Sequence, residues 1–407
     1  MKRIVFVNLH ASWMLLETAE VRLFKYSKAI KHGYLLNYLL NSSDYEVCNY
    51  VNDRAASLIS GGSDAFHKFL NLFGKIEWNS VFKFNGIPKE KITIIKNTSE
   101  IRKDDIVILY NLFRSNFRGV AEIDAFKAVS MLHFHGKKGE DERIREVNAS
   151  CLFNESNLSK TSEIFRKYYN LSIPWVVHPF VFAKRFEVKT PFNERKNMAF
   201  ATGTITYKKH EEFLETYGDP CDQPLRKQIK DNPDYFADTI YCTSSDYYED
   251  SAAKEITAKD GKLTRLYKNL YNRFFTGKQK KYYSFDMVEV FNSYKMCIVG
   301  EEILGVPGIG FVEGMACGCA YIGLNSSMYT DLGLIPGVHY ITYDGSKEDL
   351  KRVIEYYQMD EHQSKLEQIA KNGCEYVRKN FVGDAAAELL LKQLEEQQKV
   401  WLSRKGN

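Results

Sequence analysis

Long apolar runs are missing from this sequence. No stretch of about 20 residues is free of polar side chains, and a membrane-spanning helix needs that length. The 8 cysteines are scattered and include no CxxC pair, the spacing typical of zinc and redox sites. Isolated cysteines of this kind are usual in reduced, cytosolic proteins. We therefore expect no transmembrane helix, no metal site and a cytoplasmic location.

An excess of one charge is missing too, because 56 basic and 52 acidic residues leave a net charge of +4. Dedicated nucleic-acid-binding proteins are usually much more basic, so we expect no nucleic-acid partner.

Residues 1–7 resemble a signal peptide only superficially. Asn8, His10 and Glu17 interrupt the apolar run, and no cleavage site of small residues follows. We interpret this segment as a first β-strand.

The chain is too long for one ordinary domain. Its 407 residues are 44% hydrophobic and 27% charged, as in globular proteins. Apolar strand patterns alternate with helical patterns, which predicts an α/β fold with parallel sheets. The polar segment 187–197 predicts a boundary. We expect an N-terminal domain at 1–190, a C-terminal domain at 191–383 and a terminal helix at 384–407.

Strands and helices can be placed along most of the chain. In the first half, strands are predicted at Ile4–Val7, Tyr45–Val51, Asp105–Tyr110, Ala128–His135, Ala149–Asn154 and Trp175–His178. In the second half, strands are predicted at Met198–Thr202, Met296–Val299, Ala320–Gly323 and His339–Tyr343. Helices are predicted at 158–169, 286–295, 346–357, 360–380 and 384–401. Residues 205–270 are polar and rich in tyrosine and charge, and no element can be placed there.

The segment 300–345 carries the clearest pattern of a ligand site. Gly308 and Gly310 permit a tight turn whose backbone approaches a ligand closely. A helix is predicted to begin just after this turn, and the N-terminus of a helix favours a phosphate group. Glu313, in the first turn, can accept hydrogen bonds from ribose hydroxyls. A glycine turn before a helix is also common in α/β proteins without such a site.

Residues 311–323, with the sequence FVEGMACGCAYIG, resemble the donor-site signature of GT-B glycosyltransferases. In that signature an acid is followed by an Ala-Cys-Gly turn and a strand. The nearest type is glycosyl-transferase group 1, CgeB-like, and the likeness covers 270–385 well but 1–200 only by the order of elements. It implies two Rossmann-like domains facing across a cleft, with the C-terminal helix packing back toward the N-domain.

The resemblance also implies the activity. A glycosyltransferase moves a sugar from a nucleotide-sugar donor to a hydroxyl of a glycan or lipid-linked acceptor, here in bacterial surface-polysaccharide synthesis. Donor binding is implied for Gly310, Phe311, Glu313 and Gly314, with Glu313 also a catalytic candidate. No cofactor is implied, and GT-B enzymes in general need no metal. Many retaining members carry a further glutamate that would fall at Gly305, so retaining and inverting mechanisms both stay open.

The loop after the first strand of the C-terminal domain faces the donor phosphates in that family. Here it contains Gly203, Thr204, Lys208 and Lys209. Glycine permits close approach, and threonine and lysine can meet the diphosphate. The two lysines are equally compatible with a solvated surface.

A second basic segment, residues 274–283, interleaves lysines with phenylalanine and tyrosine. This composition fits a nucleotide, an anionic membrane surface or a plain solvated face. Peripheral contact with the inner face of a membrane therefore stays open.

In the first half, His133 and His135 end a predicted strand. The carboxyl ends of parallel strands are where α/β folds bind ligands. A histidine there can take the proton of an acceptor hydroxyl, since its ordinary pKa is about 6.5. His10 and the pair Asn154-Glu155 follow other strands in the same way. Packing or loop roles are the alternative for all of them.

Three other functions have to be weighed. A non-catalytic sugar-nucleotide-binding homologue would share the site without turnover. An epimerase or phosphorylase would share the fold, although the sequence identifies no cofactor lysine. A dehydrogenase is disfavoured, because Asn8-Leu-His-Ala-Ser-Trp13 stands where a GxGxxG motif would follow the first strand.

Replacing His133 or His135 by alanine is expected to lower turnover about 100-fold while changing donor binding little, as loss of a general base does. Initial rates and calorimetric donor affinities measure the two effects separately. Full activity in both single variants would remove these histidines as base candidates.

Overall fold

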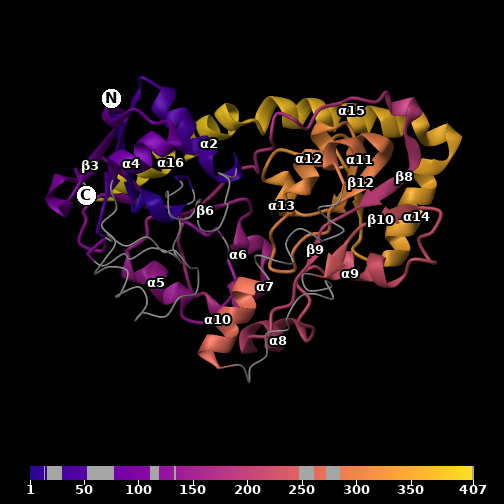
Figure 1. Ribbon diagram of the computed structural model, residues 1–407, viewed down its shortest axis with the longest axis horizontal. Helices are drawn as coiled ribbons and strands as arrows, with labels where there is room; N and C mark the ends of the chain where they lie inside the picture. The colour runs from indigo at the N-terminus through magenta and orange to yellow at the C-terminus, as the bar shows by residue number, and fades with distance from the viewer. Residues whose placement is uncertain are drawn as a thin grey trace. The chain divides into compact units, whose positions relative to one another are not determined.

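The computed structural model describes residues 1–12, 14–15, 30–52, 78–110, 119–132, 134–246, 261–271 and 285–405. The chain divides into two compact units, each made of separate segments (Figure 1). Unit 1 comprises Met1–Asn157, Phe165–Val181 and Asn380–Asn407, and unit 2 comprises Leu158–Ile164 and Phe182–Lys379. His133 and the basic segment 274–283 lie outside the described residues.

The described part of unit 1 contains a parallel sheet of seven strands in the order β3-β2-β1-β4-β5-β6-β7. The strands are β1 (Lys2–Val7), β2 (Tyr45–Tyr50), β3 (Ile92–Ile95), β4 (Ile106–Leu109), β5 (Phe126–Ser130), β6 (Cys151–Asn154) and β7 (Trp175–Val177). Apolar residues predominate in most of these strands because both faces of a parallel sheet are covered. The sequence did not predict β3. The order reverses between β1 and β4, as in a Rossmann-like sheet.

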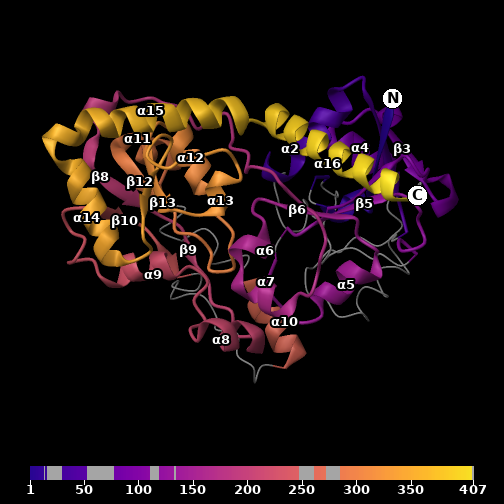
Figure 2. The ribbon, with the colours of Figure 1, turned by 180° about the vertical axis from the view of Figure 1, so that it is seen from behind.

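Helices cover this sheet, and the last helix of the chain is one of them. The helices within unit 1 are α2 (Ile30–Asn41), α4 (Trp78–Asn85), α5 (Glu140–Glu146) and α16 (Gly383–Lys405). In α16, the side chains of Ala386, Ala387, Leu390, Leu391 and Leu394 form one fully buried stripe. Figure 2 shows α16 beside α2. The terminal helix therefore packs on the N-terminal sheet, as predicted.

Unit 2 is also built on parallel strands. Its described residues contain a five-stranded sheet in the order β10-β8-β12-β13-β14 and a short pair, β9 and β11. The strands are β8 (Lys196–Ala201), β9 (Thr204–Ile205), β10 (Ile240–Cys242), β11 (Ser245–Asp246), β12 (Tyr294–Ile298), β13 (Ala320–Leu324) and β14 (Ile341–Tyr343). The order reverses between β8 and β12, which is where an open α/β sheet binds its ligand.

Some of the helices of unit 2 begin at a side-chain cap. The helices of this unit are α6 (Leu158–Thr161), α8 (Glu211–Tyr217), α9 (Pro224–Asp231), α10 (Lys262–Tyr271), α11 (Met287–Ser293), α12 (Gly310–Ala316), α13 (Ser327–Thr330), α14 (Lys347–Gln358) and α15 (Gln363–Asn380). The side chain of Asp286 caps α11, and that of Ser346 caps α14. The helix predicted at 158–169 is wrong as one element, because α6 ends at Thr161 and α7 (Glu163–Tyr168) starts anew.

The polar segment expected to connect the domains is fixed to unit 2. The Asn292 Oδ1 atom accepts hydrogen bonds from the backbone amides of Lys189 (2.7 Å) and Thr190 (3.2 Å). Arg195, which is buried, donates to the carbonyl oxygens of Thr190 (2.8 Å) and Cys317 (2.9 Å). Polar residues that look like a solvated connector therefore serve as buried hydrogen-bonding groups.

Helix α12 packs directly on β12 because its contact residue is glycine (Figure 1). A Cβ atom on Gly314 would lie 2.5 Å from the Cys297 Sγ atom and 3.1 Å from Phe291 Cε1. No real side chain tolerates the first distance without movement of the strand or the helix. The backbone of α12 thus lies close to the sheet, and its first turn is held at the end of β12.

Replacing Gly314 by alanine is expected to lower the unfolding free energy by about 1–3 kcal/mol, because the new methyl group overlaps the Cys297 sulfur. Cys297→Ala in the same chain should recover part of the loss, since it removes that sulfur. Denaturant midpoints of the two single variants and the double variant form the test. Simple additivity of the two changes would contradict this packing.

Candidate functional site

Three glycines at the carboxyl edge of the unit 2 sheet surround one arginine side chain. A Cβ atom on Gly203 would lie 2.6 Å from the Arg226 Cζ atom, and one on Gly308 would lie 2.7 Å from Nη2. A Cβ atom on Gly300 would lie 3.2 Å from Arg226 Cγ. Gly203 also has a φ of +134°, which favours glycine. We call Gly203, Gly300, Gly308 and Arg226 the glycine cradle.

Arg226 is a buried cation with spare hydrogen-bonding capacity. It is 9% exposed, and it extends from α9, which Pro224 begins at the favoured first position. Its Nη1 atom donates to the Thr204 carbonyl oxygen at 2.7 Å. Its Nε atom is buried and has no hydrogen-bond partner among the described residues. A buried donor without a partner is costly, and an anion would satisfy it.

Glu301, three residues after the end of β12, is buried at this edge of the sheet and links two strands through hydrogen bonds. Its Oε1 atom accepts hydrogen bonds from the Leu324 amide (3.0 Å) and from the Tyr329 hydroxyl (2.7 Å). Tyr329 in turn shares a 2.6 Å hydrogen bond with the Tyr321 hydroxyl. Burial raises the pKa of the Glu301 carboxyl, and these hydrogen bonds and the Arg226 charge oppose that rise. The network joins the ends of β12 and β13.

Helix α12 begins at Gly310, close to where the sequence predicted its first turn. A Cβ atom on Gly310 would lie 3.0 Å from Val299 Cγ2, so the helix starts against the end of β12. Phe311 is fully buried beside Tyr321, with ring centroids 5.5 Å apart. Glu313 is half-buried in the first turn. The cradle glycine Gly308 immediately precedes this turn.

Comparisons with known proteins agree with this fold. Residues 250–392 match the family described as glycosyl transferase-like. A glycosyltransferase from Rickettsia africae is similar in fold at 12% identity and a TM-score of 0.51, with 98% of this chain and 99% of that chain covered. Sucrose-phosphate synthase from Thermosynechococcus elongatus is similar at 13% identity and a TM-score of 0.50, with 98% and 100% covered. Residues 250–392 are thus similar to glycosyl transferases, and the chain has the GT-B fold.

HepE from Anabaena in complex with UDP matches at 10% identity and a TM-score of 0.46, with 97% of this chain and 100% of that chain covered. No curated protein sequence matches this chain. Within the described residues, no helix is long and apolar enough to cross a membrane. In the same part of the chain, no group of three or more His, Cys, Asp or Glu side chains could hold a metal ion.

The structure brings some predicted donor residues together and separates others. Gly203 and Thr204 both contact Arg226, which also lies against Gly308. The Lys208 Nζ atom instead forms an ion pair with the buried Asp222 at 3.1 Å, and Lys209 is exposed. Sequence reasoning missed Arg226, because the stretch around it shows no clear pattern. Proline before the arginine, as a helix-start signal, was the available clue.

The position of the missing family glutamate has a structural explanation. Gly305 has a φ of +88°, and a Cβ atom there would lie 2.6 Å from the carbonyl carbon and oxygen of Thr161. The Thr161 hydroxyl also donates to the Gly305 carbonyl oxygen at 2.8 Å. Both the backbone angle and the neighbouring backbone therefore exclude a glutamate. The chain departs from the two-glutamate pattern because α6 occupies the space.

In unit 1, the strand predicted to reach His135 ends earlier. β5 stops at Ser130, because the Phe134 amide turns back to the Met131 carbonyl oxygen at 3.1 Å. His135 is exposed in the following loop. His133 and the side chain of His10 lie outside the described residues.

A buried polar group lies at the ends of β6 and β7 in the same unit. Asn154 and Glu155 are 2% and 7% exposed, and the Asn154 Nδ2 atom has no hydrogen-bond partner in the described part of the chain. The His178 Nδ1 atom and the Tyr34 hydroxyl are 3.1 Å apart. Burial lowers the pKa of His178, and the charge of Glu155 opposes this. Burial, the charge of Tyr110 and that of Glu155 raise the pKa of Tyr34.

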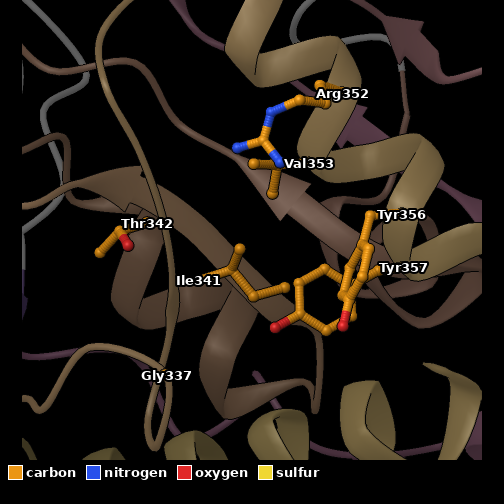
Figure 3. A pocket seen from close by; sticks show the side chains of 7 residues that line it. All are labelled: Gly337, Ile341, Thr342, Arg352, Val353, Tyr356 and Tyr357. Carbon is orange, nitrogen blue, oxygen red and sulfur yellow. The ribbon is translucent and has the colours of Figure 1, made fainter.

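Figure 3 shows a separate pocket of about 220 Å³ at the outer edge of the unit 2 sheet. Its lining residues are Gly337, Ile341, Thr342, Arg352, Val353, Tyr356 and Tyr357. Four of them project from α14, and Ile341 and Thr342 belong to β14 (Figure 3). The predicted donor residues do not line this pocket.

Replacing Gly305 by alanine is expected to destabilise the protein by about 1–3 kcal/mol more than Gly218→Ala does, because only the first change adds overlap. Gly218 is the matched control, since its φ is +72° and a Cβ atom there meets nothing within 4 Å. Both variants carry the left-handed strain. Equal shifts of the denaturant midpoint would show that Thr161 leaves room at position 305.

Proposed function

We propose that this glycosyltransferase binds the diphosphate of a nucleotide-sugar donor in the glycine cradle and transfers the sugar to a hydroxyl of a glycan or lipid-linked acceptor. The observation that carries the proposal is the buried guanidinium of Arg226, whose Nε atom lacks a hydrogen-bond partner among the described residues. It lies between Gly203 and Gly308, where the absence of side chains lets a ligand approach the backbone.

Charge development during sugar transfer explains why a cation belongs there. As the bond to the sugar breaks, negative charge grows on the leaving diphosphate. A guanidinium offers several fixed N–H donors and stabilises phosphate oxygens with charge-assisted hydrogen bonds. Because Arg226 is already desolvated and held by Thr204, little reorganisation is needed during the reaction.

The remaining donor residues have assigned roles in this proposal. Glu313, half-buried in the first turn of α12, accepts hydrogen bonds from ribose hydroxyls. Gly310, Phe311 and Gly314 shape the turn and keep α12 against the sheet. Lys209 is exposed and Lys208 is paired with Asp222, so their part is to add positive potential near the diphosphate. We propose that no metal or other cofactor is required.

On the acceptor side, His133 and His135 remain the proposed bases. An imidazole removes the hydroxyl proton as the oxygen attacks the sugar carbon. The acceptor class and a role in bacterial surface-polysaccharide synthesis rest on the family resemblance. A non-catalytic nucleotide-binding homologue is the alternative, and nucleotide binding without donor turnover would favour it.

Nucleotide binding tests the cradle directly. We expect one member of a panel of UDP, GDP, CMP, ADP and dTDP to raise the melting temperature, with or without Mg²⁺. A ligand at about 100 times its Kd adds about 2.7 kcal/mol of stability. Arg226→Met should weaken the affinity of that nucleotide about tenfold or more, since a charge-assisted hydrogen bond is worth about 1.5–3 kcal/mol. Glu313→Ala should weaken it as well.

Arg226→Lys keeps the charge but loses the planar donor set, so an intermediate affinity is expected. Lys371→Met, on the exposed surface of α15, removes a charge elsewhere in unit 2 and is the matched control. Calorimetry on well-folded variants gives the comparison. Unchanged affinity in both Arg226 variants would place the diphosphate elsewhere, and the absence of any nucleotide shift would overturn the donor proposal.

A further inference from the structure

Helix α10 turns an apolar stripe toward solvent. Leu263, Leu266, Tyr267 and Leu270 are spaced i, i+3, i+4 and i+7, so they share one helical face. Leu263 is 82% exposed, Leu266 42% and Tyr267 55%. An amphipathic helix of a globular protein normally buries this stripe in its core. Clustered exposed apolar side chains on one face mark an interaction surface.

The charges of α10 are all of one sign. Lys262, Arg265 and Lys268 alternate with the apolar positions, and the helix contains no acidic residue. The sequence that follows has the same bias, because residues 261–283 contain seven basic residues and no acidic one. The whole chain carries +4 and this stretch +7, so the remainder carries −3. Positive charge is therefore concentrated in the sequence of this exposed apolar helix and of the residues that follow it.

We propose that α10 docks the enzyme on an anionic lipid surface. A helix of this kind lies in the plane of the interface, with its apolar face among the acyl chains and its basic residues at lipid phosphates. Exposed leucines fit a lipid surface better than they fit a nucleic acid, which would be met by basic and stacking side chains alone. The basic residues require negative headgroups, which distinguishes the surface from a neutral bilayer.

This docking surface is independent of the glycine cradle. No residue of α10 is a cradle residue, and vesicle binding needs neither donor nor acceptor. Failure of the docking proposal and failure of the donor-site proposal can therefore be told apart. The inference also assigns a role to exposed side chains that sugar transfer itself does not use.

Vesicle co-sedimentation of the full chain tests the surface. We expect vesicles of phosphatidylcholine with phosphatidylglycerol to bind the enzyme about tenfold or more tightly than phosphatidylcholine alone, and added salt to weaken the binding. Leu263→Gln with Leu266→Gln and Tyr267→Gln should lower the affinity about tenfold or more. The matched control is Ile335→Gln with Val338→Gln, which are 52% and 39% exposed in the same unit.

A second variant separates charge from apolar contact. Replacing Lys262, Arg265 and Lys268 by glutamine should abolish the preference for anionic vesicles, since each basic residue contributes about fivefold to binding. Melting temperature and nucleotide binding should stay unchanged in both triple variants, which shows that each still folds.

Four results would overturn the proposal. The first is that the enzyme does not bind anionic vesicles, and the second is that the Leu263/Leu266/Tyr267 variant binds them as tightly as the unchanged enzyme does. The third is that this variant loses self-association and keeps vesicle binding. The fourth is that a single-stranded RNA homopolymer displaces the enzyme from vesicles.

Discussion

A buried guanidinium without a full set of hydrogen-bond partners is the constraint around which the carboxyl edge of unit 2 is arranged. Burying a charge is costly unless opposite charge or hydrogen bonds compensate it. Arg226 donates one hydrogen bond, to the Thr204 carbonyl oxygen, and interacts electrostatically with the carboxyl group of Glu301. Two of the residues against its guanidinium, Gly203 and Gly308, are glycines and present no side chain to it. An anion that enters this site would satisfy the remaining donors of the guanidinium, and in the proposed function that anion is the leaving diphosphate.

The same edge explains why this chain departs at one position from the glycosyltransferase signature that it resembles. A glutamate at position 305 would meet the backbone of Thr161, a residue from the first half of the sequence. Glu301, the acid that precedes it, points into a network with Tyr329 and Leu324 instead of toward a ligand. The carboxylate of Glu301, which interacts electrostatically with Arg226, is therefore a structural one. In the proposed function, Glu313 is the acid of the signature that meets the donor.

Two amphipathic helices show how one local pattern leads to opposite outcomes. In α16 the apolar stripe that includes Leu390 and Leu394 is fully buried against unit 1. In α10 the stripe that includes Leu263 and Leu266 is exposed. Periodicity predicts that a helix has an apolar face, and it does not say what covers that face. The polar segment 187–195 shows the opposite case, because its sequence looks solvated. In the structure, its Lys189 amide donates to Asn292, and its Arg195 is buried and donates to the Thr190 carbonyl oxygen.

The sequence by itself determined the α/β class, the strands that follow apolar runs, and the glycine turn that leads into α12 and Glu313. These features are local, because strand and helix periodicities and turn residues act over a few neighbouring positions. Only the tertiary structure decided that Arg226 meets Gly203 and Gly308, that Lys208 pairs with Asp222, and that Gly305 lies against Thr161. Each of these contacts joins residues far apart in the chain, and such partners are chosen by the packing of the sheet and its loops.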